Sequence, residues 1–185
     1  MASTGIFGGA FDPPHNGHVA LVDAAKRHFG FTRLLVLVVA APGHRVVHSA
    51  VETRLALACL AFAGDEVELD EHARTVDMLR ARRLDDPVVL VGADELVAFP
   101  TWKEPESVLE LARLGVATRP GFDREAVEAA RAAASRPDRV ELFEIEPVPV
   151  SSTEIRRRVA AGDPIDGLVP PAVAAEIERL GLYRD

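Results

Sequence analysis

The chain has very little cysteine and no long hydrophobic run. Cys59 is the one cysteine among 185 residues, so an intrachain disulfide is excluded. The longest uninterrupted apolar stretches, 34–42 and 55–63, are nine residues each, whereas a membrane-spanning helix needs about 20. The first residues also lack the basic and apolar regions of a secretory signal peptide. We therefore expect a cytoplasmic protein without a membrane span, in which Cys59 is a buried thiol.

A basic excess is missing too. The formal net charge is −8 and only 5% of the residues are aromatic, which argues against a nucleic-acid partner. The charge is uneven, because residues 1–60 carry five basic and three acidic side chains, net +2, whereas residues 61–185 carry 16 and 26, net −10. An anion-binding site is therefore expected to be local and to involve the N-terminal third.

Apolar, strand-like runs alternate with helix-like segments along the chain. Strands are expected at 4–10, 34–41, 67–70, 87–91, 115–118 and 140–145, and helices at 17–29, 51–63, 76–83, 106–113, 124–134, 153–161 and 172–180. Such alternation indicates βαβ units. We predict one Rossmann-like α/β domain over residues 1–185, with a parallel sheet, helices on both faces and a helical C-terminal portion over about 151–185.

The irregular segments of the chain follow the ends of predicted strands. They cover residues 8–18, 42–48, 92–104 and 146–153. Ligands of parallel α/β sheets bind beyond the carboxyl ends of the strands, so these four segments are expected to meet at one crevice.

The strongest motif is GIFGGAFDPPHNGH at residues 5–18. Gly8 and Gly9 have no Cβ to keep a phosphate from the backbone. His15 and His18 stand three residues apart at the start of a helix, whose amides and dipole favour an anion. Two alternatives stay open. One is a glycine-rich turn with two surface histidines, and the other is a metal-binding histidine pair, although zinc sites use three or four ligands.

A second motif, VSSTEIRRR, covers residues 150–158. Ser151 and Glu154 have the spacing of a helix capping box, which explains both residues. Two further hydroxyls, Ser152 and Thr153, with Arg156 one turn into the helix, would form a second anion site at a helix N-terminus. The alternative is a capped helix start with solvated arginines.

The two motifs resemble those of the HxGH nucleotidylyltransferases. Residues 8–18 are similar to the signature G-[GS]-[TS]-F-D-P-x-H-x-G-H, and residues 150–156 are similar to [IV]-S-S-T-x-I-R. Between them, GADEL at 92–96, FPTWK at 99–103 and ATRPG at 117–121 resemble the nicotinate (nicotinamide) mononucleotide adenylyltransferase branch. The resemblance covers essentially the whole chain. It implies transfer of the adenylyl group of ATP to nicotinate mononucleotide, with release of pyrophosphate, in NAD biosynthesis.

The resemblance also implies roles for individual residues. Those implied in catalysis are His15, His18 and Arg156. Those implied in ATP binding are Gly8, Gly9, Phe11, His15, His18, Gly92, Asp94, Ser152, Thr153 and Arg156, and those implied in mononucleotide binding are His44, Arg45, Thr75, Trp102 and Arg119. Mg²⁺ would arrive with ATP, held by phosphate oxygens and water and not by a metal site of the protein. Association into a homo-oligomer stays open.

Three positions depart from the family pattern. Ala10 stands where Thr or Ser is usual, the family's Pro-Pro-His-Lys loop reads Pro-Gly-His-Arg at 42–45, and Ala73-Arg74 replaces a Ser-Tyr pair. Other acceptors therefore stay open, namely nicotinamide mononucleotide and phosphopantetheine, as does an ATP-binding paralogue without turnover. Trp102 as core filler and Asp94 as a turn or cap residue are the structural alternatives at those two positions.

Overall fold

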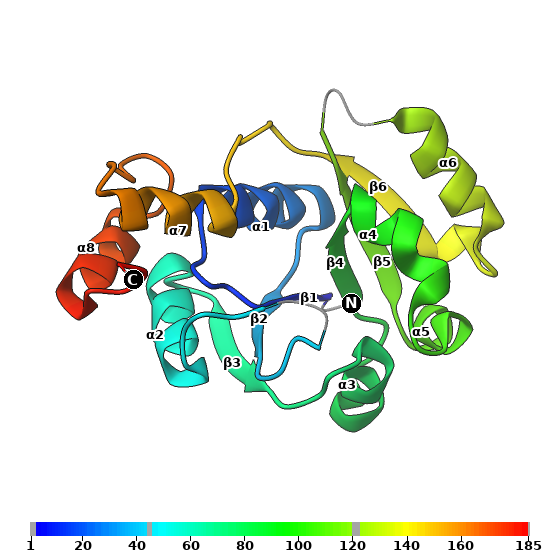
Figure 1. Cartoon of the computed structure of the whole chain (residues 1–185). Helices are drawn as coiled ribbons and strands as arrows, with labels where there is room; N and C mark the ends of the chain where they lie inside the picture. The colour runs from blue at the N-terminus through cyan, green and yellow to red at the C-terminus, as the bar shows by residue number, and fades with distance from the viewer. Residues whose placement is uncertain (1–2, 44–45, 120–122, 185) are drawn as a thin grey trace.

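A sheet of six parallel strands runs through the middle of the molecule (Figure 1). The computed structural model describes residues 3–43, 46–119 and 123–184. The strands are β1 (Thr4–Gly9), β2 (Arg33–Val39), β3 (Glu66–Asp70), β4 (Val88–Gly92), β5 (Arg113–Thr118) and β6 (Val140–Glu144). Their order across the sheet is β3-β2-β1-β4-β5-β6, and each pair of neighbours is parallel.

The chain winds outward in two directions from the centre of this sheet. β1 to β3 proceed to one edge and β4 to β6 to the other, so β1 and β4 are neighbours, with Ile6 paired to Val89. A reversal of this kind leaves a crevice at the carboxyl ends of the two central strands, where ligands of such folds bind. The predicted Rossmann-like α/β fold is confirmed.

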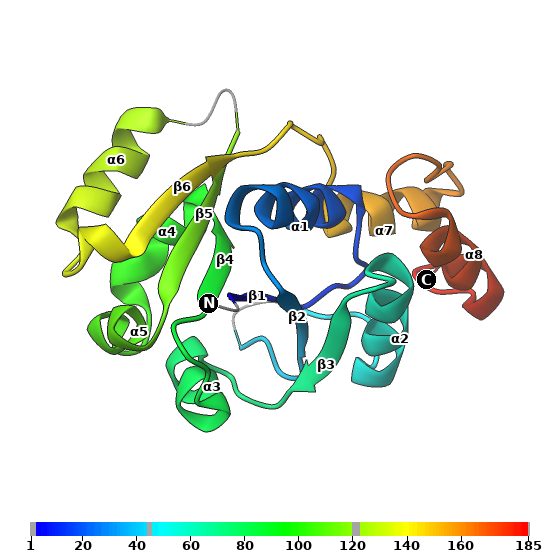
Figure 2. The ribbon, with the colours of Figure 1, turned by 180° about the vertical axis from the view of Figure 1, so that it is seen from behind.

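The described ranges contain eight α-helices, of which the first six lie between strands and the last two follow β6. They are α1 (Asn16–Phe29), α2 (Val51–Ala61), α3 (Thr75–Arg82), α4 (Ala93–Ala98), α5 (Pro105–Leu111), α6 (Arg124–Ala133), α7 (Ser152–Ala161) and α8 (Pro171–Leu180), with 3₁₀ turns η1 (Phe99–Thr101) and η2 (Pro137–Arg139). α6 lies at one end of the molecule and α8 at the other, beside α2, in both views (Figures 1 and 2). Within the described residues, no helix is long and apolar enough to cross a membrane.

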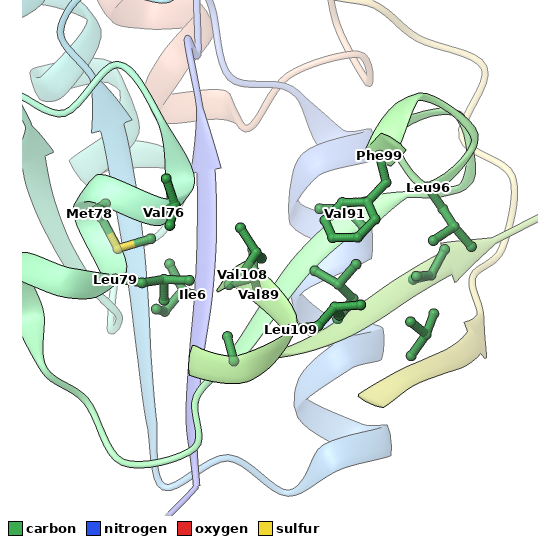
Figure 3. Close-up of a cluster of buried hydrophobic side chains, with 14 of the residues drawn as sticks. Ile6, Val76, Met78, Leu79, Val89, Val91, Leu96, Phe99, Val108 and Leu109 are labelled. Atoms are coloured by element: carbon green, nitrogen blue, oxygen red, sulfur yellow. The ribbon is translucent and has the colours of Figure 1, made fainter. Parts of the chain in front are cut away.

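Strand residues point alternately to the two faces of the sheet, and each face carries its own core. Ile6 belongs to the cluster that packs against α3, α4 and α5 (Figure 3). The next residue, Phe7, belongs to the cluster on the opposite face, which packs against α1 and α2. A third cluster joins α2, α7 and α8 around Leu57, Ile155 and Val173. The C-terminal helices are thereby fixed to the half of the sheet that carries β1.

Two predictions about local structure are wrong. Residues 92–104 contain α4 and η1, although a loop was expected, because a six-residue helix is too short to show a helical period. Cys59 is exposed, although a buried thiol was expected. The buried face of α2 is formed by Arg54, Leu57 and Ala58 at helical spacing, and this phase turns Cys59 outward.

Candidate active site

A cavity of about 1240 Å³ lies at the carboxyl ends of the strands, where the segments that follow all six of them converge. Of the residues predicted for the site, those lining the cavity are Gly8, Gly9, Phe11, His15, His18, Thr75, Gly92, Asp94, Trp102, Arg119, Ser152, Thr153 and Arg156. His44 and Arg45 lie outside the described residues. The fold therefore brings segments from all parts of the sequence to one crevice, as predicted.

His15 and His18 are joined at the start of α1 by reciprocal hydrogen bonds. The amide of His18 donates to Nδ1 of His15 at 3.3 Å, and the amide of His15 donates to Nδ1 of His18 at 3.2 Å. The two rings are stacked, with centroids 3.6 Å apart and planes 16° from parallel. His15 thus takes the place of the usual Ser, Thr, Asp or Asn at a helix N-cap.

These contacts set the protonation of both rings. Because each Nδ1 accepts a hydrogen from an amide, the ring proton of each neutral imidazole is on Nε2. Burial lowers the pKa of His15 to about 4, so its ring is neutral at pH 7. His15 is therefore suited to donate a hydrogen bond to an anion without adding a full positive charge, and the ring of His18 lies stacked against it.

A cluster of phenylalanine rings packs against the histidine pair at the ring of His18. Phe11 is only 2% exposed and meets the ring of His18 edge-on, with centroids 5.2 Å apart. A Cβ at Gly9 would come within 2.8 Å of the Phe11 ring, whereas one at Gly8 would meet nothing within 4 Å. Packing therefore requires glycine at position 9, and Gly8 leaves the backbone open toward the cavity.

The start of α7 is tied to the loop that follows β1. Ser152 donates from Oγ to the carbonyl of Pro13 at 2.8 Å, and Arg156 donates to the carbonyl of Asp12 at 2.7 Å. A second guanidinium nitrogen of Arg156 donates to Oγ1 of Thr153 at 3.3 Å. The two sequence motifs, about 140 residues apart, thus form one continuous wall of the cavity.

The predicted capping box at α7 is only half correct. Oγ of Ser151 accepts from the amide of Glu154 at 3.2 Å, as expected. The carboxylate of Glu154, however, binds Arg157 and Arg158, and these hydrogen bonds lower its pKa to about 2. The two arginines are therefore paired on the helix surface, and of the three arginines in the motif Arg156 is the one that lines the cavity.

Gly92 and Asp94 lie together at the end of β4. A Cβ at Gly92 would come within 2.5 Å of Oδ1 of Asp94, so any larger residue would displace that carboxylate. Asp94 is exposed in the first turn of α4 and borders the cavity. The carboxylate of Asp94, exposed at the edge of the cavity, can accept hydrogen bonds from hydroxyl groups of a ligand.

Trp102 lies between the hydrophobic core and the cavity. Its half-buried indole meets the ring of Phe99 edge-on, with centroids 5.3 Å apart, and packs against the first core cluster. Thr75 at the start of α3 and Arg119 just after β5 border the same cavity. An indole that is supported by the core and borders a cavity can stack on a flat aromatic ligand.

Arg54 is a buried residue whose role was not predicted from the sequence, and its hydrogen bonds hold the loops of the site in place. It is 1% exposed and donates to three carbonyls, those of Ala10 at 2.9 Å, Val39 at 2.8 Å and Ala40 at 2.8 Å. It therefore joins the loops that follow β1 and β2. The available signal was a charged residue three positions before Leu57, on the side of the helix that faces the core.

Asp12 is the second residue that sequence analysis did not assign. It is 3% exposed, and its carboxylate accepts hydrogen bonds from the amides of His48 and Ser49 and from the hydroxyl of Tyr183. Burial alone would raise the pKa of Asp12, but these hydrogen bonds outweigh burial and lower it. Asp12 is therefore ionised and connects the β1–α1 loop with two distant parts of the chain.

The donors around the cavity do not form a metal site. Among residues 3–43, 46–119 and 123–184, no three His, Cys, Asp or Glu side chains are grouped so that they could hold a metal ion. The cavity is instead lined by hydrogen-bond donors and by three arginines of the described residues, Arg74, Arg119 and Arg156, which suit phosphate.

Comparisons with known proteins point the same way. The family model described as cytidylyltransferase-like matches residues 6–158. Two proteins named probable nicotinate-nucleotide adenylyltransferase, from Thermus thermophilus and Thermomicrobium roseum, are 40% and 38% identical to this chain. The alignments cover 97% and 100% of this chain, and 98% and 92% of the relatives.

A solved structure has the same fold. It is the Plasmodium falciparum nicotinic acid mononucleotide adenylyltransferase complexed with NaAD, which is 16% identical, with a TM-score of 0.76 over 99% of this chain and 98% of that one.

The fold is that of a nucleotidyltransferase, a class whose members act on nucleotides with a divalent metal ion. The chain belongs to the cytidylyltransferase-like family, and within it to the nicotinate-nucleotide adenylyltransferases.

Proposed function

We propose that this protein transfers the adenylyl group of ATP to nicotinate mononucleotide, and that residues 1–185 act as one cytoplasmic domain. The products are the deamido form of NAD and pyrophosphate. The observation that carries the proposal is the stacked pair of His15 and His18, on the same cavity wall as Arg156. Relatives that align with the chain over its length and are named for this activity support it.

The chemistry requires no covalent intermediate. An oxygen of the 5′-phosphate of the mononucleotide attacks the α-phosphorus of ATP in line, and the bond from that phosphorus to the pyrophosphate oxygen breaks. The attacking phosphate is already largely ionised at neutral pH, since its second pKa is about 6. A general base is therefore not needed, and the protein has to position the reactants and stabilise the charge that develops.

The residues at the two helix starts are suited to these tasks. Nε2–H of His15 and His18 would donate to phosphate oxygens, and Arg156 would neutralise the departing pyrophosphate. The N-terminal amides of α1 and α7, the open backbone at Gly8, and Thr153 would add further donors. Because these groups are held by the loops around Asp12 before substrate arrives, little reorganisation is needed during the reaction.

Mg²⁺ enters in this proposal as part of the substrate, MgATP. Within the described residues, no three His, Cys, Asp or Glu side chains are grouped so that they could hold the ion. Phosphate oxygens and water would supply its ligands, which agrees with the preference of Mg²⁺ for such a shell.

The other side of the cavity is suited to the mononucleotide. Trp102 would stack on the pyridine ring, with Thr75 and Arg119 nearby, and Gly92 and Asp94 would lie at the adenosine ribose. His44 and Arg45 are further candidates for this part of the site. The altered pair Ala73-Arg74 immediately precedes Thr75, so the test of the function has to include the choice of acceptor.

Pyrophosphate release with MgATP tests the proposal, with nicotinate mononucleotide, nicotinamide mononucleotide and phosphopantetheine as parallel acceptors. A clear preference for nicotinate mononucleotide is the expected result. Preference for another acceptor would replace the substrate but keep the reaction. ATP binding without pyrophosphate release from any of the three would identify an ATP-binding protein without this activity.

A further inference from the structure

The hydroxyl of Tyr183 lies within a partly buried hydrogen-bond network that reaches the site. It donates to Oδ1 of Asp12 at 2.7 Å and accepts from Oγ of Ser49 at 3.0 Å. Tyr183 follows the end of α8, and its ring packs against the cluster that joins α2, α7 and α8. Burial raises the pKa of Tyr183, so its hydroxyl keeps its proton as a donor.

Asp12 passes this contact on to the cavity in two ways. Its carbonyl accepts from Arg156 at 2.7 Å, which orients the guanidinium that lines the cavity. Its other carboxylate oxygen accepts from the amides of His48 and Ser49, shortly after Val46, which also lines the cavity. The orientation of Asp12 therefore affects the placement of two walls of the cavity, one at Arg156 and one near Val46.

We propose that Tyr183 is a positioning residue for adenylyl transfer, acting through Asp12 on Arg156 and on the segment around His48 and Ser49. The inference rests on the proposed function for its kinetic effect, and on the hydrogen bonds alone for its structural effect. Tyr183 does not line the cavity and has no contact with a reacting group.

The physical reason lies in what the hydroxyl satisfies. Without it, one oxygen of a buried carboxylate and the hydroxyl of Ser49 each lose a partner, and both groups reorient to recover one. Reorientation of Asp12 moves the carbonyl that holds Arg156. Small displacements of a group that stabilises the transition state reduce turnover more than they reduce ground-state binding.

Tyr183→Phe is the direct test, because it removes the hydroxyl and keeps the ring. Val173→Ala is the matched control, since Val173 is buried in the same C-terminal cluster and has no part in the network. We expect kcat of Tyr183→Phe to fall about tenfold, with KM for MgATP changed by less than about twofold. Val173→Ala should keep the wild-type kcat at temperatures well below its melting point. Equal kcat values for Tyr183→Phe and wild type, or equal losses in both variants, would overturn the proposal.

Amide hydrogen exchange provides a readout that does not depend on activity. The amides of His48 and Ser49 should exchange at least about tenfold faster in Tyr183→Phe, and at the wild-type rate in Val173→Ala. Unchanged exchange in Tyr183→Phe would overturn the proposal whatever the kinetics. If the wild-type protein turns over none of the three acceptors, the proposed function fails, and the exchange rates still decide whether Tyr183 positions the site.

Discussion

The imidazole rings of His15 and His18 lie stacked 3.6 Å apart while each Nδ1 accepts the backbone amide of the other residue. A proton on either Nδ1 would remove one of these hydrogen bonds. The helix cap and the tautomer of the two rings are therefore one property. The site presents hydrogen-bond donors of fixed direction, and Arg156 supplies the fixed positive charge at this wall.

The buried His15 predicts a loss of stability in mild acid. The unfolded chain binds the proton near pH 6.5 and the folded protein near pH 4, so the unfolded state holds more protons between these values. The free energy of unfolding should fall by about 3 kcal/mol as the pH drops from about 6.5 to about 4. Denaturant titrations at several pH values across this range measure the free energy of unfolding.

His15→Asn is the control for this prediction, because asparagine is a good N-cap without a titrating group in this range. It should flatten the pH dependence between 6.5 and 4. The pKa of Asp12 is lowered below its ordinary 3.8, so the contribution of Asp12 is lost only at more acidic pH. An equally steep loss in His15→Asn would show that His15 is not its source.

Replacement of His18 should reduce turnover far more than stability. His18→Ala removes the Nε2 donor, and the loss of one preorganised donor to a developing charge lowers kcat by about 10²–10³-fold. His18→Gln separates the two roles, because a glutamine oxygen can accept the amide of His15 as in a capping box. The Gln variant should keep wild-type stability and still lose turnover. A variant with near wild-type kcat would remove His18 from the mechanism.

Trp102→Ala should separate the two substrates. If the indole stacks on the pyridine ring, KM for nicotinate mononucleotide should rise about tenfold or more, since aromatic stacking contributes on the order of 1 kcal/mol beyond burial. KM for MgATP should stay within about twofold. Leu111→Ala is the control, because Leu111 packs against the same core cluster and does not line the cavity. Equal rises in both KM values would favour a purely structural role for Trp102.

Arg54→Met should destabilise the fold. The substitution leaves three carbonyls without their donor, and its expected cost is about 3 kcal/mol. For a chain of this size the melting temperature would then fall by about 6–12 °C. Arg54→Lys keeps the charge but offers one nitrogen in place of two, so its loss should be smaller. Calorimetry measures both, and a Met variant as stable as wild type would contradict the assignment.

Much of the fold was predictable because short runs of apolar residues and helix-capping residues indicate individual strands and helices. The strand β2 has a continuous apolar run that is buried from Leu34 to Val38, and the start of α7 has a capping serine at Ser151. α4 was not predicted because its six residues form less than two helical turns, which is too short to show a helical pattern of apolar residues. Cys59 was misplaced because the apolar run around it has no clear phase until Arg54 is recognised as a buried residue.

The predicted cavity-lining residues came from the two motifs and from the segments between them that resemble the family, but the residues that hold them in place were not predictable. Asp12, Arg54 and Tyr183 act through contacts between segments that are distant in the sequence, and a polar residue in a sequence does not reveal a buried partner far away. The half-formed capping box shows the same limit. The spacing predicts that the carboxylate of Glu154 caps the start of the helix, but this carboxylate instead accepts hydrogen bonds from Arg157 and Arg158.

The hydrogen bond between Tyr183 and Asp12 joins residues 171 positions apart. On the ribosome, the glycine- and histidine-rich loop and all six strands are made before α8 and Tyr183. A nascent chain with a complete sheet still lacks the hydroxyl that fixes Asp12. The crevice is therefore fully organised only after residue 183 has been synthesised.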